Sequence, residues 1–155
     1  MHPRAEQFRD RVRRELNVEI DPREFPEGTK TAADAADAIG CDVAQIASSI
    51  VFVADDPVVV VTSGANRVNE DRLAAHSGAE GARTADPEEV RAATGYAIGG
   101  VPPFAHDGDV PTYMDETLLS FETVWAAAGT PEAVFPVAPG RLRELADADP
   151  VDVTG

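Results

Sequence analysis

The stretch IASSIVFVADDPVVVVT, residues 46–62, predicts the centre of the fold. Two apolar, β-branched runs are separated by the sequence DDP at 55–57, which favours a turn between strands. The unbroken valines of the second run indicate a strand buried on both faces. We therefore expect a central β-hairpin, whose first strand is apolar except at Ser48 and Ser49.

Upstream of the hairpin, residues 4–16 carry apolar side chains at every fourth position, from Phe8 to Leu16. That spacing predicts a helix with a narrow apolar stripe on a polar surface. Its arginines include a cluster at Arg11, Arg13 and Arg14. The cluster is either a solvated helix face or a patch that contacts RNA.

Between that helix and the hairpin we expect three short features. The alternating residues 18–20 predict a brief strand, and the sequence FPEG at 25–28 predicts a turn. Thr31 has the character of a helix N-cap, and Gly40 ends the alanine-rich helix that follows.

Downstream, Asn69 and Asp86 each predict the start of a helix; Gly78 ends the first, and the second runs through Thr94. Further elements are expected as strands at 112–114, 123–127 and 133–137, a turn or short helix at 116–121 and a helix at 139–146. The acidic residues 147–155 are expected to fray. This irregular order predicts an α+β fold, with residues 1–155 as a single domain and a core at about 18–146.

Composition narrows the function classes. The 155 residues include 28 acidic and 13 basic side chains, a net charge of -15, with Lys30 as the single lysine. Such a surface repels phosphate at low salt, so charge alone argues against RNA as a partner, and we expect no binding to DNA. The same surface is also typical of proteins that work in molar salt, where the Debye length falls to about 3 Å. We expect a cytoplasmic protein that does not bind membranes. The sequence has a single cysteine, it has no apolar run long enough to cross a membrane, and it shows no apolar leader.

The sequence TGYAIGGVPPF at 94–104 is the strongest candidate for a ligand-binding loop. Glycine lets the backbone approach a ligand closely, and proline fixes φ, so the loop is tight but not flexible. Its free N–H and C=O groups would then hold a carbonyl or hydroxyl group. The alternative is a plain connection between a helix and a strand.

This segment resembles the Gly-x-x-x-Pro loop of the YbaK family, the free-standing aminoacyl-tRNA deacylases related to the editing domain of bacterial prolyl-tRNA synthetases. Other matching pieces occur in family order, including GANRVN at 64–69 and AAGTP at 127–131. The resemblance covers about residues 31–145. It implies a curved, nearly barrel-like mixed sheet flanked by helices, and an ester hydrolase that clears the 3′ end of mischarged aminoacyl-tRNA.

The resemblance also assigns site residues. It implies that Gly99 and Gly100 hold the carbonyl or ribose, and that Ile98, Val101, Pro102, Pro103 and Phe104 bound a small amino-acid pocket. Thr31 begins the helix that matches the family's early helix. Independently of the resemblance, His106 lies two residues beyond the loop and could orient a water or the ligand; the alternative is a solvated loop residue. Asp115 would bind the amino group, unless it caps the following turn.

One departure concerns the family pattern Ile-x-Lys-Ser-Leu, which here reads IASSI at 46–50. Ser48 stands where the family has a lysine, and a hydroxyl carries no charge. Lys30 could reach the pocket from the preceding loop. The alternative to a hydrolase is therefore a catalytically impaired module that binds aminoacyl-tRNA or a small amino-acid derivative.

No nucleophile elbow, clustered His/Cys set or phosphate-binding glycine loop occurs, so we expect neither a metal nor a cofactor. The resemblance implies instead that the neighbouring ribose hydroxyl of the substrate helps to activate water. The protein would then contribute geometry and backbone dipoles.

Overall fold

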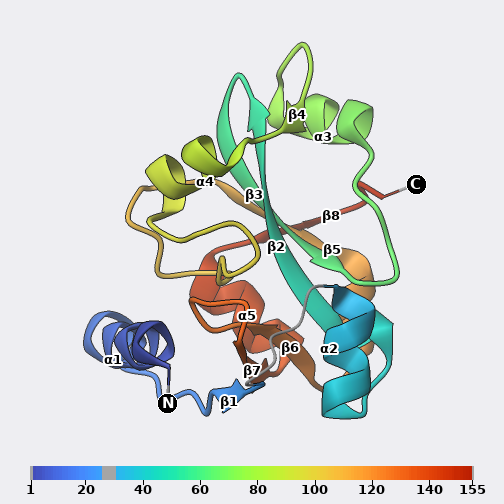
Figure 1. Cartoon of the computed structure of the whole chain (residues 1–155). Coiled ribbons are helices and arrows are strands. Elements are labelled where there is room, and N and C mark those ends of the chain that lie inside the picture. The colour runs from blue at the N-terminus through green and yellow to red at the C-terminus, as the bar shows by residue number, and fades with distance from the viewer. Residues whose placement is uncertain (1, 26–30, 155) are drawn as a thin grey trace.

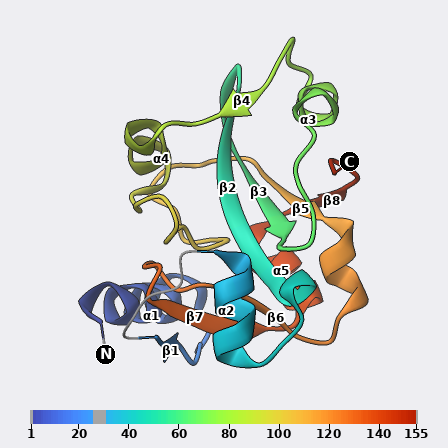
Figure 2. The same cartoon turned by 45° about the vertical axis from the view of Figure 1, so that its right-hand side comes forward.

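The computed structural model describes residues 2–25 and 31–154. Over these residues the chain forms five α-helices, two 3-10 helices and eight strands. In chain order they are α1 (Pro3–Leu16), β1 (Arg23–Glu24), α2 (Ala32–Ile39), η1 (Val43–Gln45), β2 (Ile46–Ala54), β3 (Asp56–Ser63), α3 (Glu70–Ser77), β4 (Arg83–Thr84), α4 (Pro87–Thr94), β5 (Thr112–Asp115), η2 (Glu116–Ser120), β6 (Val124–Ala127), β7 (Ala133–Val137), α5 (Pro139–Ala146) and β8 (Asp149–Val151). Figures 1 and 2 show a curved mixed sheet with short helices around it, which confirms the predicted α+β class.

The predicted hairpin is confirmed as β2 and β3, the longest strands of the sheet (Figure 2). They pair antiparallel from Ala47 opposite Ser63 to Ala54 opposite Asp56, and Asp55 turns the chain at a φ of 66°. The side chains of residues 59–61 are fully buried, as the valine run indicated. The turn is tighter than expected, because Pro57 already lies within β3.

The sheet is assembled around this hairpin in the order β1-β7-β6-β2-β3-β5-β8, and β4 pairs with β2. Strand β3 covers one edge of β2 along its length. The other edge is shared: β6 pairs with it in parallel at Ile46 and Ala47, and β4 pairs antiparallel at Phe52 and Val53. This division of one edge between two short strands positions the site described below.

The helix boundaries follow the capping residues that the sequence indicated. The side chain of Thr31 accepts a hydrogen bond from the Asp34 N–H at 3.1 Å, and Asn69 and Asp86 cap α3 and α4 in the same way. Gly40, Gly78 and Gly95 end these helices in the left-handed conformation. Each of these caps satisfies backbone groups that the helix itself leaves unpaired. Helix α5 also has the predicted bounds.

Two predictions at the ends of the chain were wrong. Residues 18–20 form no strand, although Val18 is buried against the core, because no strand pairs with them among the described residues. Residues 147–155 do not fray over their described part: β8 pairs in parallel with β5, and Val153 is fully buried. The valines of this acidic tail supply the apolar surface that docks it. Of the turn expected at 25–28, residues 26–28 lie outside the described residues.

Candidate functional site

A cavity of about 340 Å³ opens beside β2, where its shared edge has no neighbour. Among the described residues, no strand pairs with this edge between Ala47, the last partner of β6, and Phe52, the first partner of β4. The volume lies within the range of small-molecule sites. The cavity is lined by Thr31, Ala32, Ala35, Ile46, Ala47, Ser48, Ser49, Ile50, Val51, Thr84, Ala85, Val90, Ile98, Gly99, Val101, Trp125, Ala127, Pro131, Ala133 and Val134.

The walls of the cavity are mainly apolar and come from segments far apart in the sequence. Helix α2 contributes small residues on one side, and α4 contributes Val90 on the other. The loop at 95–104 and the turn before β7 close the remaining sides with Gly99 and Pro131. Because many lining side chains are alanines, the room is created by small residues rather than by a missing element.

Ser49 brings an unpaired polar group to this apolar site. Its hydroxyl oxygen is buried and has no hydrogen-bond partner among the described residues. A buried polar atom without a partner costs about 1–3 kcal/mol. Because Ser49 is part of the cavity lining, a ligand or a water in the cavity is the candidate partner for this hydroxyl.

The main chain of Ser49 faces the same gap. In an antiparallel pair, successive residues turn their N–H and C=O groups alternately toward the partner and away from it. The Gly64 N–H donates to the Ile46 C=O at 2.8 Å on the β3 side, and the Ala85 N–H donates to the Val51 C=O at 3.0 Å on the opposite side. Ser49 shares the alternation of Val51, so its N–H and C=O point toward the unpaired edge.

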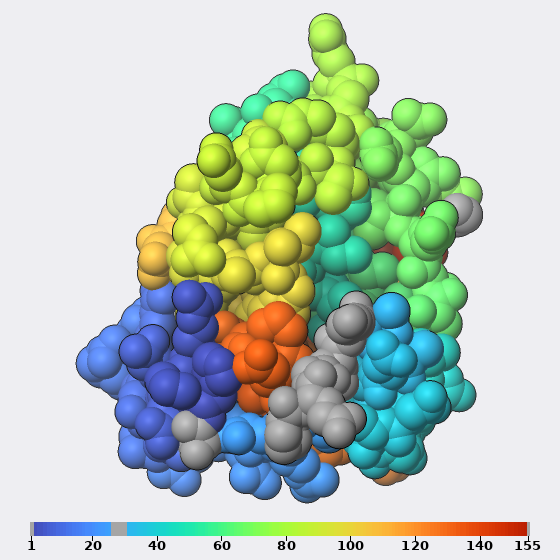
Figure 3. All heavy atoms as spheres, in the orientation of Figure 1, coloured from blue at the N-terminus to red at the C-terminus, as the bar shows by residue number. Residues whose placement is uncertain are grey.

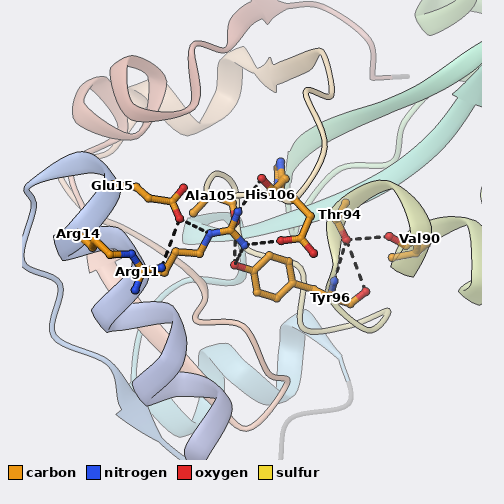
Figure 4. A network of polar contacts seen from close by, with 9 residues as sticks. Arg11, Arg14, Glu15, Val90, Thr94, Tyr96, Ala105 and His106 are labelled. Atoms are coloured by element: carbon orange, nitrogen blue, oxygen red, sulfur yellow. Dashed lines mark hydrogen bonds and ion pairs between the residues drawn. The ribbon is translucent and has the colours of Figure 1, made fainter.

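The loop at 95–104 is fixed by hydrogen bonds at its start. The Thr94 hydroxyl donates to the Val90 carbonyl at 2.7 Å and accepts from the Tyr96 N–H at 3.1 Å (Figure 4). The Tyr96 hydroxyl donates to the Ala105 carbonyl at 2.8 Å, which joins the two ends of the loop. The Gly100 N–H donates to the Ala97 carbonyl at 3.0 Å. The loop is therefore held in one shape without contacts from a ligand.

Arg11 fastens helix α1 to this loop. Its guanidinium contacts the carboxylates of Glu15 and Asp107, each at 2.7 Å, and donates to the His106 carbonyl at 2.9 Å (Figure 4). It also donates to the Tyr96 hydroxyl at 3.4 Å. The arginine that the sequence placed in a cluster on the helix thus has a structural role at the candidate site.

The structure brings five of the predicted site residues to the cavity. The lining includes Thr31, Ser48, Ile98, Gly99 and Val101. Ile98 is 55% exposed at the rim, where it leaves apolar surface free for a ligand. The predicted Lys30 lies outside the described residues.

Four other predicted residues of the loop lie behind the cavity wall. Gly100, Pro102, Pro103 and Phe104 are buried and are not part of the lining. The Phe104 ring packs on Phe8 and Phe135 at centroid distances of 6.0 and 5.8 Å. These residues shape the loop from the core side rather than facing a ligand.

His106 lies beside the loop and is not part of the cavity lining. Its Nε2 lies 2.7 Å from the Pro102 carbonyl oxygen. A carbonyl only accepts, so Nε2 carries the proton. Burial lowers the pKa of His106 below its ordinary value, which keeps the ring neutral. In the structure, His106 contacts its own loop.

Asp115 lies outside the lining and is 2% exposed. Its carboxylate accepts hydrogen bonds from the Ser63 N–H at 3.1 Å, the Asn66 amide at 2.9 Å and the Thr117 N–H at 3.0 Å. The last of these caps η2, which is the turn-capping role weighed in the sequence. The carboxylate is therefore engaged within the fold.

Sequence reasoning missed Ser49 as a site residue. The signal was present, since two consecutive serines interrupt a β-branched strand. One of two neighbouring residues must face each side of a strand, but the sequence does not say which edge lacks a partner.

No group of three or more His, Cys, Asp or Glu side chains is placed to hold a metal ion within residues 2–25 and 31–154. None of the helices in that part of the chain has the length and apolar character needed to cross a membrane.

Comparison with known proteins gives consistent matches. A family model described as the aminoacyl-tRNA editing domain matches residues 26–145. YwhH of Bacillus subtilis (strain 168), an uncharacterised protein, is 35% identical over 133 residues, which are 83% of each chain. EbsC of Enterococcus faecalis, a candidate Cys-tRNA(Pro)/Cys-tRNA(Cys) deacylase, is 26% identical over 125 residues, 74% of this chain and 76% of EbsC.

A solved structure matches over the whole fold. It is that of a candidate trans-editing enzyme for prolyl tRNA synthetase, and it superposes with a TM-score of 0.93 at 38% identity. The superposition covers 100% of this chain and 99% of the other. The similarity thus includes the loop, the turn and the strands that line the cavity.

Proposed function

We propose, on the premise that this chain belongs to the aminoacyl-tRNA editing domain family, that it hydrolyses the ester bond of mischarged aminoacyl-tRNA in trans. The observation that carries this proposal is the cavity at the open edge of β2, with the unpaired hydroxyl of Ser49 at its wall. A mainly apolar pocket whose lining includes the hydroxyl residues Thr31, Ser48, Ser49 and Thr84 suits a small amino acid joined to a ribose. The candidate deacylase and trans-editing enzyme among its relatives support the same reaction.

In the proposed reaction, the amino-acid side chain occupies the apolar cavity, and the ester carbonyl lies against the loop at Gly99 and the main chain of Ser49. Water attacks the carbonyl carbon, the bond to the ribose oxygen breaks, and the proton from water passes to that oxygen. The neighbouring ribose hydroxyl helps to orient the water. The protein contributes positioning and fixed dipoles, which are effective because they do not reorganise during the reaction.

The direct test is a panel of tRNAs, each charged with a different small amino acid, incubated with the purified protein at low and at molar salt. We expect release of at least one small amino acid well above the rate without protein. The identity of the amino acids released will show which side chains the cavity of about 340 Å³ accepts. Absence of release from every member of the panel would refute a hydrolase.

The second candidate is a binding module without turnover, and Ser48 is the observation that favours it. Ser48 lines the cavity at the position where the resemblance places a lysine. Such a module would bind uncharged and mischarged tRNA in the same assay without releasing amino acid.

Replacement of Ser48 by lysine tests how much the missing charge matters. We expect Ser48→Lys to raise kcat/KM for deacylation by about tenfold, since a hydrogen bond to a charged group contributes about 1.5–3 kcal/mol. Ser48→Met, of similar length and without charge, is the control and should give no increase. Equal rates for the lysine and methionine variants would contradict a role for charge. Activity that occurs only in the lysine variant would favour the binding module.

A further inference from the structure

A second depression lies beside the cavity, between α1 and the end of α4. It has a volume of about 530 Å³. Four arginines line it, and we call it the arginine groove: Arg4, Arg11, Arg14 and Arg91. Asp10 is the one carboxylate among the described residues that line it. Once Glu15 and Asp107, which pair with Arg11, are counted with Asp10, the four guanidinium groups leave one net positive charge here, on a protein whose net charge is -15.

The side chains of the groove are not all neutralised within the fold. Arg11 is bound by Glu15 and Asp107. Arg4 and Arg91 are exposed and form no ion pair with any described residue. Arg14 approaches the Glu15 carboxylate only to 3.7 Å and is 72% exposed. The guanidinium groups of Arg4, Arg14 and Arg91 are thus available to bind an anion from solvent. They line the same groove as Arg11, which is held by its carboxylate partners.

The net negative charge of the whole chain does not prevent an anion from binding in the arginine groove. At about 0.1 M salt, charges farther apart than about 10 Å are largely screened. A phosphate in the groove therefore experiences the nearby guanidinium groups more than the acidic residues on other faces. The surplus of carboxylates lowers the affinity of the rest of the surface for phosphate, and so confines phosphate binding to this groove.

The arginine groove adjoins the cavity through two shared segments. In the loop, Tyr96 lines the groove and Ile98 lines the cavity. In the turn before β7, Gly129 lines the groove and Pro131 lines the cavity. Residues two apart have Cα atoms at most about 7 Å from each other. Figure 3 shows α1 in blue, the turn near residue 130 in orange and the loop in yellow side by side on one face.

We propose that the arginine groove binds the phosphate backbone of the RNA strand whose aminoacylated 3′ end enters the cavity. This inference rests on the proposed function. Guanidinium groups suit this role because they pair with phosphate oxygens through two parallel hydrogen bonds. Contacts with phosphate carry no sequence information, so the groove holds and orients the RNA, while the cavity selects the amino acid.

The test compares two triple variants that remove the same charge. The groove variant is Arg4→Gln with Arg14→Gln and Arg91→Gln, three exposed positions. The control variant is Arg67→Gln with Arg141→Gln and Arg143→Gln, which are exposed and line neither the cavity nor the groove. The probe is an uncharged RNA hairpin with a single-stranded 3′ tail, titrated from 0.05 to 1 M salt. Thermal unfolding verifies that both variants are folded.

Loss of three phosphate contacts should reduce the slope of log affinity against log salt by about 2, at about 0.7 per contact with a single strand. The groove variant should therefore bind about 100-fold more weakly than the wild type at 0.1 M salt, and the two should converge at 1 M. The control variant should bind as the wild type does or slightly more weakly. Equal losses in the two variants, or no binding of the hairpin by the wild type, would overturn the proposal.

The two proposals fail in different assays. If the wild type deacylates tRNA but the groove and control variants bind the hairpin equally well, the arginine groove is refuted and the hydrolase stands. If the groove variant alone loses binding but no tRNA of the panel is deacylated, the hydrolase is refuted and the arginine groove stands.

Discussion

Replacing Gly100 by alanine is expected to reduce deacylation by about 100-fold and to destabilise the fold. A Cβ atom at this position would lie 2.8 Å from the Thr130 Cα and 3.0 Å from the Pro131 Cδ. These atoms belong to the backbone and to a proline ring, so they cannot rotate away, and the loop must move off the turn. Displacement of a positioning loop by about 1 Å costs about 100-fold in rate. Overpacking of this kind costs about 1–3 kcal/mol in stability.

A matched control separates this steric effect from the general effect of removing a glycine. Gly140→Ala adds the same methyl group where nothing lies within 4 Å, and no positive φ is required there. The control should keep wild-type deacylation and stability. The two variants are compared by release of labelled amino acid from tRNA and by urea unfolding. If Gly100→Ala behaves as Gly140→Ala does, the contact between loop and turn does not position the site.

Replacing Ser49 by alanine is expected to raise stability and lower activity at the same time. The hydroxyl is buried and has no partner in the part of the chain that the structure describes, so its removal should stabilise the fold by about 1 kcal/mol, or about 2–4 °C in Tm. The same change removes a hydrogen bond that we propose forms only with the substrate. Loss of such a bond should lower kcat/KM by about tenfold.

Ser63→Ala is the control variant, and it is expected to lower the stability of the fold where Ser49→Ala raises it. The Ser63 hydroxyl donates to the Ala44 carbonyl at 2.7 Å and lies outside the cavity lining. Its loss leaves that partner less satisfied and should destabilise the fold by about 1 kcal/mol. Both variants are followed by thermal unfolding and by deacylation of the same mischarged tRNA. A loss of stability in Ser49→Ala would mean that the hydroxyl has a partner within the fold, and the argument for a ligand-directed group would end.

The local elements of this protein follow directly from local sequence. Thr31, Asn69 and Asp86 begin helices, and Gly40 and Gly78 end two of them, as predicted. These signals are reliable because a cap and its orphan backbone groups lie within four residues of one another. The hairpin of β2 and β3 was predictable for the same reason, because its two strands and the turn between them are contiguous in the sequence.

Some of the loop residues singled out in the sequence line the cavity, and others do not. Ile98, Gly99 and Val101 reach the cavity, whereas Phe104 and Asp115 lie in the fold. Apolar character alone does not tell a pocket wall from a core residue, because both remove apolar surface from water. A carboxylate after a strand is equally suited to a ligand or to a cap until its neighbours are known.

The helices, the central hairpin, the family resemblance and the loop could all be predicted from the order of the residues. The three-dimensional fold was needed to learn that β4 and β6 leave part of β2 unpaired, that Ser49 faces this gap, and that arginines of α1 and α4 meet in one groove. It also decided that the acidic tail supplies β8. The physical reason is the same in each case. These features depend on pairings between segments distant in the chain, and a residue's local sequence does not encode which segment will lie beside it.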